Sequence, residues 1–191
     1  MRQTEYSRKT RETDITAQVN LDGTGLATIK TGIAFLDHML TSLATHSLID
    51  IEVKAVGDLR HHIAEDTALV LGEAIKQALQ QDQRITRFAD ASVPMDESLA
   101  TCSVDLGGRP YSVIDLGLLK SMTEDMANED IVHFMESLAM SLRANIHIKV
   151  EYGYNDHHKA EAAFKALARC LRAATAIDPR RTEAPSSKGS I

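Results

Sequence analysis

Apolar and polar residues alternate along some stretches of this chain, whereas in others apolar residues recur every three or four positions. Alternation is typical of a half-buried strand, and the longer period is typical of an amphipathic helix. In the first half these patterns predict strands over residues 15–21 and 24–30, a helix over 35–43, a strand over 49–56 and a helix over 62–81. Asp22-Gly23 separates the first two strands, which favours a hairpin there.

The second half has the same order of elements. Its patterns predict strands over residues 99–106 and 111–116, a helix over 130–142, a strand over 144–152 and a helix over 156–176. Residues 82–98 are predicted to be a connection and residues 178–189 a loop, because neither stretch keeps a regular apolar period. Each half is therefore predicted as strand, strand, helix, strand, helix.

The two halves also match residue by residue. His38–Ala44 matches His133–Ala139 at an offset of 95, and Ile51–Lys54 matches Ile146–Lys149 at the same offset. A duplicated unit explains these matches better than chance does. We therefore interpret residues 1–191 as a single domain made of two repeats, about 1–90 and 91–191.

A His-His-x-x-Glu motif opens the last predicted helix of each repeat. The first copy is His61-His62-x-x-Glu65 and the second is His157-His158-x-x-Glu161. Adjacent residues point about 100° apart around a helix, so the two imidazoles of one motif can serve two different metal ions, or a metal and a substrate. A hydrogen-bonded or solvated His pair near a helix start is the alternative for one copy, but two copies in register favour a metal site.

The repeat adds a third histidine to each half. The candidate ligands then form two equivalent sets, namely His38, His61, His62 and Glu65, and His133, His157, His158 and Glu161. Six imidazoles and two carboxylates suit two metal ions, each with about three His and one carboxylate. Imidazole favours Zn, Fe, Cu or Ni, and carboxylate shifts the preference towards Mn. No cysteine takes part, which argues against a structural zinc finger.

The overall composition limits the classes of function. Apolar residues make up 43% and charged residues 25% of the chain, which is ordinary for a soluble globular protein. Trp is absent, so aliphatic side chains must form the core, and we expect Cys102 and Cys170 to be buried thiols. The net charge of −6 argues against nucleic-acid binding. Because no long apolar segment is present, we expect a soluble, cytoplasmic protein without membrane contact.

Several basic residues near the motifs could bind an anion. Lys165 follows Glu161 by one helical turn, and Arg87, Arg109 and Lys188 lie in or beside predicted loops. Arg and Lys both suit phosphate, although each of these residues taken alone could be a solvated surface charge. Residues 186–189 resemble a loop that wraps an anion with hydroxyl, amine and backbone N–H groups.

Two histidines stay outside the ligand sets. His147 alternates within a predicted strand, where a surface or packing role is expected. His46 follows a predicted helix end, where it could cap the last carbonyl groups or contact substrate.

Taken together, these motifs resemble one enzyme family over nearly the whole chain. The similar segments are Phe35–Leu40, Gly57-Asp58 before His61-His62-x-x-Glu65-Asp66, Pro94–Glu97, Gly108–Tyr111, Asn155–Ala166 and Pro185–Gly189. They are similar to imidazoleglycerol-phosphate dehydratase. The resemblance implies an α+β fold of duplicated half-domains, with helices packed between two four-stranded sheets.

The resemblance also implies a function. It is the dehydration of imidazole glycerol phosphate to imidazole acetol phosphate in histidine biosynthesis, with two Mn²⁺ ions per active site in an assembly of 24 subunits built from trimers. The eight residues of the two sets would be the metal ligands. The implied substrate contacts are Glu12, Arg87, Arg109, Lys165, Ser186 and Lys188. Glu161 and Glu12 are both candidates for moving protons, and the choice between them stays open.

This chain departs from the usual family pattern in three places. The segment between Gly57-Asp58 and His61 is shorter, Ser42 stands where the family often has Gln, and Ser47 replaces a usual Gly. Two rival functions remain at this level: a non-catalytic metal-binding or metal-storage protein, and a metal-dependent hydrolase of a phosphorylated small molecule.

Overall fold

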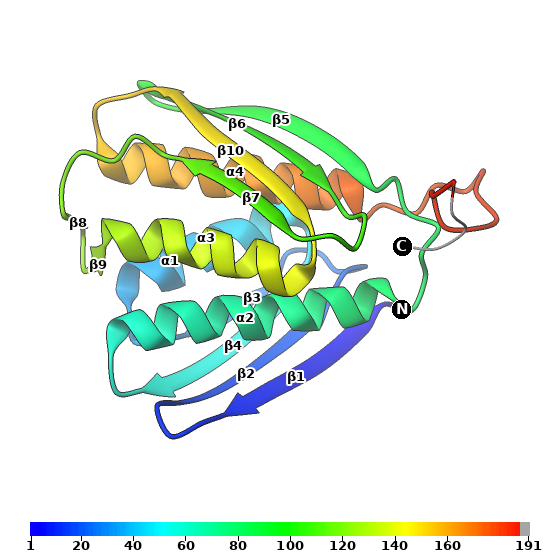
Figure 1. The fold of residues 1–191 in the computed structure, drawn as a ribbon, viewed down its shortest axis with the longest axis horizontal. Helices are drawn as coiled ribbons and strands as arrows, with labels where there is room; N and C mark the ends of the chain where they lie inside the picture. Colours follow the sequence, from blue (N-terminus) through cyan, green and yellow to red (C-terminus); the bar gives the residue numbers. More distant parts are fainter. Residues whose placement is uncertain (188–191) are drawn as a thin grey trace.

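Four helices lie between two four-stranded sheets in the computed structural model, which describes residues 1–187 (Figure 1). The first half contains β1 (Gln3–Lys9), β2 (Thr13–Asn20), β3 (Ala27–Lys30), α1 (Ala34–Ser47), β4 (Asp50–Gly57) and α2 (Arg60–Leu79). The second half contains β5 (Phe88–Met95), β6 (Ser98–Asp105), β7 (Tyr111–Asp115), β8 (Met122–Thr123), β9 (Met126–Ala127), α3 (Asn128–Leu142), β10 (Asn145–Tyr152) and α4 (Asp156–Ala174). The α+β class and the two four-stranded sheets are confirmed.

The two sheets have the same internal order. Their strands run β1-β2-β4-β3 and β5-β6-β10-β7, with two antiparallel pairs followed by one parallel pair in each sheet. Between the sheets, α2 packs against α3 and α1 packs against α4 (Figure 1). Each helix of one half thus faces a helix of the other half. The division of the chain into repeats near residue 90 stays a prediction.

The predicted hairpin at Asp22-Gly23 is wrong. β2 and β3 do not pair with each other, because β4 lies between them, antiparallel to β2 and parallel to β3. The hairpins in these sheets instead join β1 to β2 and β5 to β6. In the same way, β10 separates β6 from β7.

The prediction of a connection over residues 82–98 is also wrong, because this stretch contains the strand β5. Its inward positions carry small or medium side chains that pack on the core, namely Ala89, Ala91, Val93 and Met95. Pro94 is tolerated because β5 is an edge strand. The polar residues 1–12 gave no strand signal either, although they contain β1, whose exposed and half-buried residues alternate.

The core is aliphatic, as the absence of Trp predicts. Phe134 and Phe164 are its largest fully buried side chains, and their rings lie 5.8 Å apart between α3 and α4. Cys102 and Cys170 are buried free thiols, as predicted, and Sγ of Cys170 donates to the Cys102 carbonyl over 3.2 Å. Within the part of the chain that the structure describes, no helix combines the length and the apolar character that crossing a membrane would require.

A glycine allows the two central helices of the α2–α3 pair to approach closely. A Cβ on Gly72 would lie 2.9 Å from the Leu142 backbone nitrogen and 3.0 Å from the Leu138 carbonyl oxygen. Neither backbone atom can move aside cheaply, so only glycine fits at this crossing. The crossing matters for function, because α2 and α3 carry four of the candidate ligands.

The N-terminus of α1 is capped by a residue from the other half of the chain. Ile33, at the N-cap position, has no capping side chain, whereas the Asp125 carboxylate accepts hydrogen bonds of 2.9 Å from the N–H groups of Ala34 and Phe35. Asp125 also binds Arg60, the first residue of α2, at 2.8 Å. One carboxylate therefore fixes the starts of α1 and α2 to the loop that precedes α3.

Replacing Asp125 by Ala is expected to lower the free energy of unfolding by about 0.5–2 kcal/mol, the usual cost of a lost helix cap. Burial by itself would raise the pKa of Asp125. The hydrogen bonds from Arg60 and the two N–H groups lower the pKa by more than burial raises it, so the pKa lies below its ordinary value. The stabilisation that ionised Asp125 contributes to the folded state is thus present at neutral pH. It is lost as the pH falls through the lowered pKa. The measurement is urea unfolding of metal-free protein at neutral and acidic pH.

Asp115→Ala is the matched control for this prediction, since Asp115 is an exposed carboxylate on β7. It should change stability by less than about 0.5 kcal/mol. The capping role would be contradicted if Asp125→Ala changed the free energy of unfolding no more than Asp115→Ala does. A loss of stability that is larger at acidic pH than at neutral pH would also contradict it.

Candidate metal centre and active site

Three predicted ligands meet between α2 and α3. Nε2 of His133 lies 3.6 Å from Oε1 of Glu65, and the His133 ring stacks on the His61 ring with centroids 5.1 Å apart. Each of the three residues offers a ligand atom, and these atoms all lie within 4.8 Å of one another. We call His61, Glu65 and His133 the α2–α3 cluster. Its geometry suits a single metal ion.

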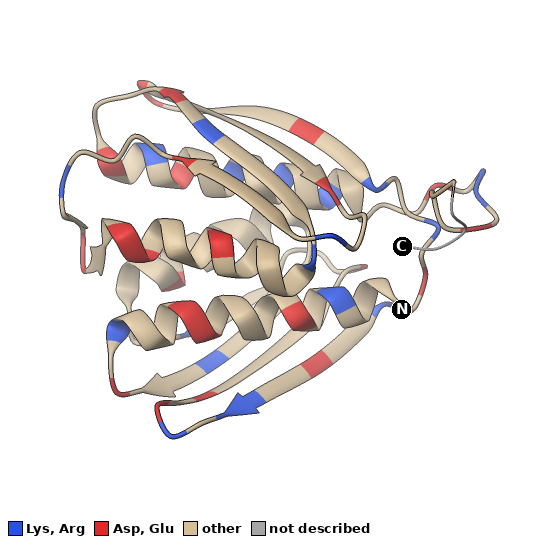
Figure 2. Ribbon diagram, viewed as in Figure 1, with Lys and Arg blue, Asp and Glu red and all other residues tan. Residues whose placement is uncertain are grey.

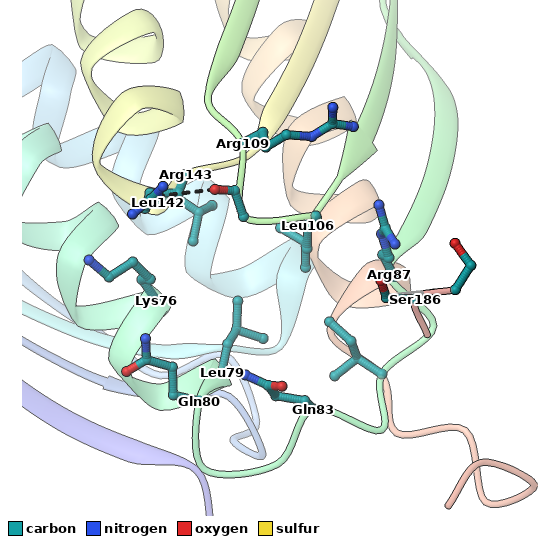
Figure 3. A pocket seen from close by; sticks show the side chains of 14 residues that line it. Lys76, Leu79, Gln80, Gln83, Arg87, Leu106, Arg109, Leu142, Arg143 and Ser186 are labelled. Carbon is teal, nitrogen blue, oxygen red and sulfur yellow. Dashed lines mark hydrogen bonds between the residues drawn. The ribbon is translucent and has the colours of Figure 1, made fainter. Parts of the chain in front are cut away.

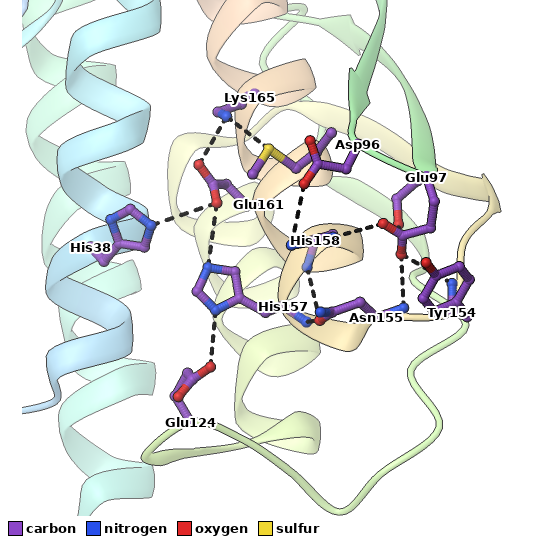
Figure 4. Close-up of polar contacts among 12 residues, drawn as sticks. His38, Asp96, Glu97, Glu124, Tyr154, Asn155, His157, His158, Glu161 and Lys165 are labelled. Carbon is purple, nitrogen blue, oxygen red and sulfur yellow. Dashed lines mark hydrogen bonds and ion pairs between the residues drawn. The ribbon is translucent and has the colours of Figure 1, made fainter.

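Three more predicted ligands meet between α1 and α4 (Figure 4). Oε2 of Glu161 lies 3.4 Å from Nε2 of His157 and 3.6 Å from Nε2 of His38. These ligand atoms also lie within 4.8 Å of one another. We call His38, His157 and Glu161 the α1–α4 cluster.

The fold groups the ligands differently from the sequence repeat. The repeat places His38 with the first motif and His133 with the second, whereas the structure brings His38 to His157 and His133 to His61. The reason is that α1 packs on α4 and α2 packs on α3. Each cluster therefore combines the motif of one half with the helix histidine of the other half.

All four motif histidines donate a hydrogen bond from Nδ1 to a carboxylate. His61 donates to Asp130 over 2.6 Å, His62 to Asp58 over 2.8 Å, His157 to Glu124 over 3.1 Å and His158 to Glu97 over 2.7 Å. Because an ionised carboxylate only accepts, each Nδ1 carries the proton and each Nε2 of a neutral imidazole keeps its lone pair for a metal. The sequence analysis assigned no role to these four carboxylates, although Asp58 and Glu97 lie in two of the segments that resemble the family.

His62 and His158 lie outside both clusters. The Asp58 carboxylate raises the pKa of His62, and the Glu97 carboxylate raises the pKa of His158. In return, the hydrogen bond from His158 lowers the pKa of Glu97 to about 2. Both imidazoles are thus firmly oriented, but neither belongs to a group of three close ligand atoms among residues 1–187.

Glu161 is surrounded by potential cations. Its other oxygen, Oε1, accepts an ion pair of 2.8 Å from Nζ of Lys165, which also contacts Sδ of Met95 (Figure 4). Burial by itself would raise the pKa of Glu161. Lys165, His38 and His157 together lower the pKa by more than burial raises it, so the pKa lies below its ordinary value. The carboxylate is therefore ionised at neutral pH. One of its oxygens pairs with Lys165, and the other faces the two imidazoles of the cluster.

Three of the predicted anion-binding residues line one pocket of about 540 Å³ (Figure 3). They are Arg87, Arg109 and Ser186, and Lys76 and Arg143 also line the pocket. Arg87 is held by Asp105 at 2.6 Å and donates to the Pro185 carbonyl, whereas Arg109 is exposed. Lys165 is not among the lining residues, and Lys188 lies outside the described residues.

The pocket and the clusters lie at opposite ends of the molecule. The clusters lie near the end at which α2, α3 and α4 begin, and the pocket lies near the two termini (Figure 1). Acidic segments lie near the starts of α2, α3 and α4, and both ends of the molecule carry basic as well as acidic segments (Figure 2). One copy of the chain therefore does not bring the predicted metal ligands and Arg109 together.

Glu12 lies close to His62 rather than to either cluster. Its carbonyl accepts a 3.0 Å hydrogen bond from the Asp58 N–H, and Asp58 is the residue that orients His62. The carboxylate of Glu12 contributes to the raised pKa of His62. The structure thus places this predicted substrate contact beside an imidazole that also stands outside the clusters.

A profile of the imidazoleglycerol-phosphate dehydratase family matches residues 31–171. The chain is 51% identical to the imidazoleglycerol-phosphate dehydratase of Dehalococcoides mccartyi strain CBDB1 over 185 residues, which cover 96% of this chain and 94% of the relative. It is 50% identical to that of Methanoculleus marisnigri, with full coverage of both chains. The chain belongs to the imidazoleglycerol-phosphate dehydratase family.

Solved structures of this family have the same fold. A crystal structure of IGPD from Pyrococcus furiosus in complex with (S)-C348 superposes with a TM-score of 0.85 at 40% identity, covering 97% of this chain and 99% of that chain. The enzyme from Staphylococcus aureus N315 gives a TM-score of 0.84 at 31% identity, covering 92% and 100%. Family membership makes this protein a lyase that dehydrates imidazoleglycerol phosphate in histidine biosynthesis.

Two of the three departures from the usual family pattern, Ser42 and Ser47, lie on α1, whereas the shorter segment after Asp58 directly precedes His61. Ser42 is buried, and within residues 1–187 its hydroxyl has no hydrogen-bond partner. Ser47 is buried and accepts a hydrogen bond of 3.2 Å from the Ile49 N–H, next to Leu48, which ends the helix in a left-handed conformation. Neither serine side chain forms a hydrogen bond with a candidate metal ligand among the described residues.

The two remaining histidines differ in their surroundings. His147 is exposed on β10 and stacks on Tyr111 at 6.2 Å, which fits the predicted surface or packing role. His46 is half-buried in the last turn of α1, where burial and the nearby charge of Lys165 lower its pKa.

Proposed function

We propose that the protein dehydrates imidazoleglycerol phosphate to imidazole acetol phosphate and water with two Mn²⁺ ions per active site. The observation that carries the metal dependence is the pair of clusters, each with two imidazoles and one carboxylate in close range. The carboxylate in each cluster favours Mn²⁺ over metals that prefer imidazole alone.

The donor groups fit a metal in their chemistry and in their orientation. In the α1–α4 cluster both imidazoles turn Nε2 towards Glu161, and in the α2–α3 cluster His133 turns Nε2 towards Glu65. A carboxylate on the Nδ1 side is the usual outer partner of a metal-binding histidine. When bound, the ions would act as Lewis acids towards the substrate's nitrogen and oxygen atoms.

Each cluster has three ligands, whereas about four protein ligands per ion are predicted. The two unused imidazoles, His62 and His158, are oriented by Asp58 and Glu97 and lie outside the clusters of their own chain. We infer that a neighbouring copy supplies each missing imidazole. This arrangement supports a homo-oligomer, and the family resemblance suggests 24 subunits built from trimers.

The same logic applies to the substrate contacts. Glu12 lies beside His62, so both would enter a site together from one neighbour. Arg87, Arg109 and Ser186 lie together at the opposite end of the chain, and Lys165 lies beside the α1–α4 cluster. The phosphate would thus be held by Lys165 of one copy and by the pocket residues of another, with Lys188 as a further predicted contact.

Two carboxylates are placed to move protons. Glu161 is ionised, partly buried and in contact with the α1–α4 cluster, so it can accept a proton from a substrate carbon next to that cluster. Glu12 is exposed within its own chain and would approach with His62. We propose Glu161 as the base and Glu12 as the second proton carrier.

The test of this function is an assay of metal-free protein with imidazoleglycerol phosphate, before and after Mn²⁺ is added. We expect imidazole acetol phosphate to form only after the addition, and no release of phosphate from a generic phosphate ester. Phosphate release would favour the metal-dependent hydrolase, and metal binding without turnover would favour a storage role.

Arg109→Ala is expected to weaken substrate binding by about 1.5–3 kcal/mol, because it removes a charged hydrogen-bond donor to phosphate. The Michaelis constant should rise, and the metal content should stay near that of the wild type. Lys120→Ala is a suitable control, since Lys120 is an exposed cation outside the pocket. Loss of metal with an unchanged Michaelis constant would show that Arg109 does not bind phosphate.

A further inference from the structure

The two clusters have the same ligand types but different surroundings. In the α2–α3 cluster, the partner of His61 is Asp130, whose side chain is only 9% exposed and lies 2.6 Å from the ring nitrogen. In the α1–α4 cluster, the partner of His157 is Glu124, whose side chain is 60% exposed and lies 3.1 Å away. A buried carboxylate at short range polarises its imidazole more than a solvated one does.

The repeat shows where this difference originates. At the offset of 95 that relates His38 to His133, the counterpart of Asp130 is Phe35. The Phe35 ring packs edge-on against His157, with centroids 5.2 Å apart. An aromatic ring thus occupies the place that a carboxylate occupies in the other half. The orienting carboxylate of His157 comes instead from the loop between β8 and β9, where Glu124 has a left-handed backbone (φ 51°).

The charges next to the two ligand carboxylates differ as well. Glu161 binds Lys165 at 2.8 Å, so part of its negative charge is already neutralised. For Glu65, the ion pairs within the described chain involve only His133, which in turn has Glu136 at 4.0 Å. The α2–α3 cluster therefore has the more negative environment, and a divalent cation gains more there.

We propose that the two metal positions are unequal: the α2–α3 cluster holds its ion tightly, and the α1–α4 cluster holds its ion weakly and loads second. This inference rests on the metal dependence proposed above. Asp130 is a positioning residue for the tight position. Lys165 lowers the metal affinity of the α1–α4 cluster and thereby keeps the ion at that cluster exchangeable.

The experiment is a titration of metal-free protein with Mn²⁺, in which the EPR signal of aqueous Mn²⁺ reports the free ion. For the wild type we expect two classes of site per subunit, with dissociation constants at least about tenfold apart, the size of effect that outer-shell partners have on metal affinity. Asp130→Asn, which keeps the shape of the side chain, should weaken the tight class about 10–100-fold and leave the weak class unchanged.

Two further variants test the other position. Glu124→Gln should weaken only the weak class. Lys165→Met should tighten that class about tenfold, because it removes a competing cation. A gain in affinity is a result that structural damage does not produce. Glu129→Gln is the matched control for Asp130→Asn, since Glu129 is an exposed carboxylate in the same turn of α3, and it should change neither class.

Two equal classes in the wild type would overturn the inference, as would an Asp130→Asn variant that behaves like Glu129→Gln. If Asp130→Asn lowered the affinity of the weak class instead, the tight site would not be the α2–α3 cluster, and the inference would be overturned as well. An absence of Mn²⁺ binding would overturn both this inference and the proposed metal dependence. Equal classes in a protein whose dehydration needs Mn²⁺ would overturn the inference alone.

Discussion

Replacing Glu161 by Gln is expected to lower the turnover number by about 10²–10⁴-fold, the usual contribution of a positioned acid or base. The side chain keeps its shape but loses the charge that faces Nε2 of His38 and of His157. It also loses its ion pair with Lys165. Metal affinity should fall as well, but by less than turnover. Steady-state kinetics and metal analysis of the purified variant measure the two effects separately.

Glu65→Gln is the matched comparison, because Glu65 is the carboxylate of the other cluster. It should lose metal and activity together, since no role in proton transfer is assigned to it. His147→Gln, on the exposed face of β10, should leave both quantities unchanged and cost at most about 1 kcal/mol of stability. Full activity of Glu65→Gln with two ions retained would contradict a site that needs both clusters.

Removal of metal is expected to abolish dehydration and to reduce the mass of the assembly. If His62 and His158 complete the clusters of neighbouring copies, each ion links two chains, and without it these imidazoles keep their bonds to Asp58 and Glu97 but lose the link to the neighbour. Light scattering during treatment with a chelator should show a smaller species, and added Mn²⁺ should restore both mass and activity.

A double variant in which His62 and His158 are both replaced by Gln serves as the control for assembly. It should have a reduced mass even when Mn²⁺ is present, because the linking ligands are missing. If the wild type keeps its full mass after complete removal of metal, the ions do not hold the copies together, and the shared-site proposal loses its structural support.

Much of the fold could be predicted from the apolar pattern, and the exceptions have clear causes. The four helices and the strongly alternating strands, such as β2 and β6, bury regular apolar faces. β1 and β5 are edge strands that have polar or small side chains at some inward positions, such as Arg8 and Ala91, so the apolar pattern is weaker there. The pairing of β3 with β4 depends on tertiary packing rather than on the turn residues.

Repetition predicted which residues are candidate ligands, but it could not predict how they group. Which histidine meets which motif depends on how α1 to α4 pack, and a repeat alignment contains no such information. Three of the four outer carboxylates are equally hidden, because Asp130, Glu97 and Glu124 lie 69, 61 and 33 residues from their histidines. Asp58 lies only four residues before His62, but the sequence analysis predicted no contact between them. Local spacing indicated only contacts within one helix, such as those of Glu161 with His157 and with Lys165, each one helical turn away.

The most direct test of the central claim is a crystal structure of the Mn²⁺-loaded protein with anomalous data collected to locate the ions. We predict two ions per active site, one at the α2–α3 cluster and one at the α1–α4 cluster, each also bound by His62 or His158 from a neighbouring copy. Ions held by ligands of a single chain, with His62 and His158 of every copy bound to no metal, would contradict the claim.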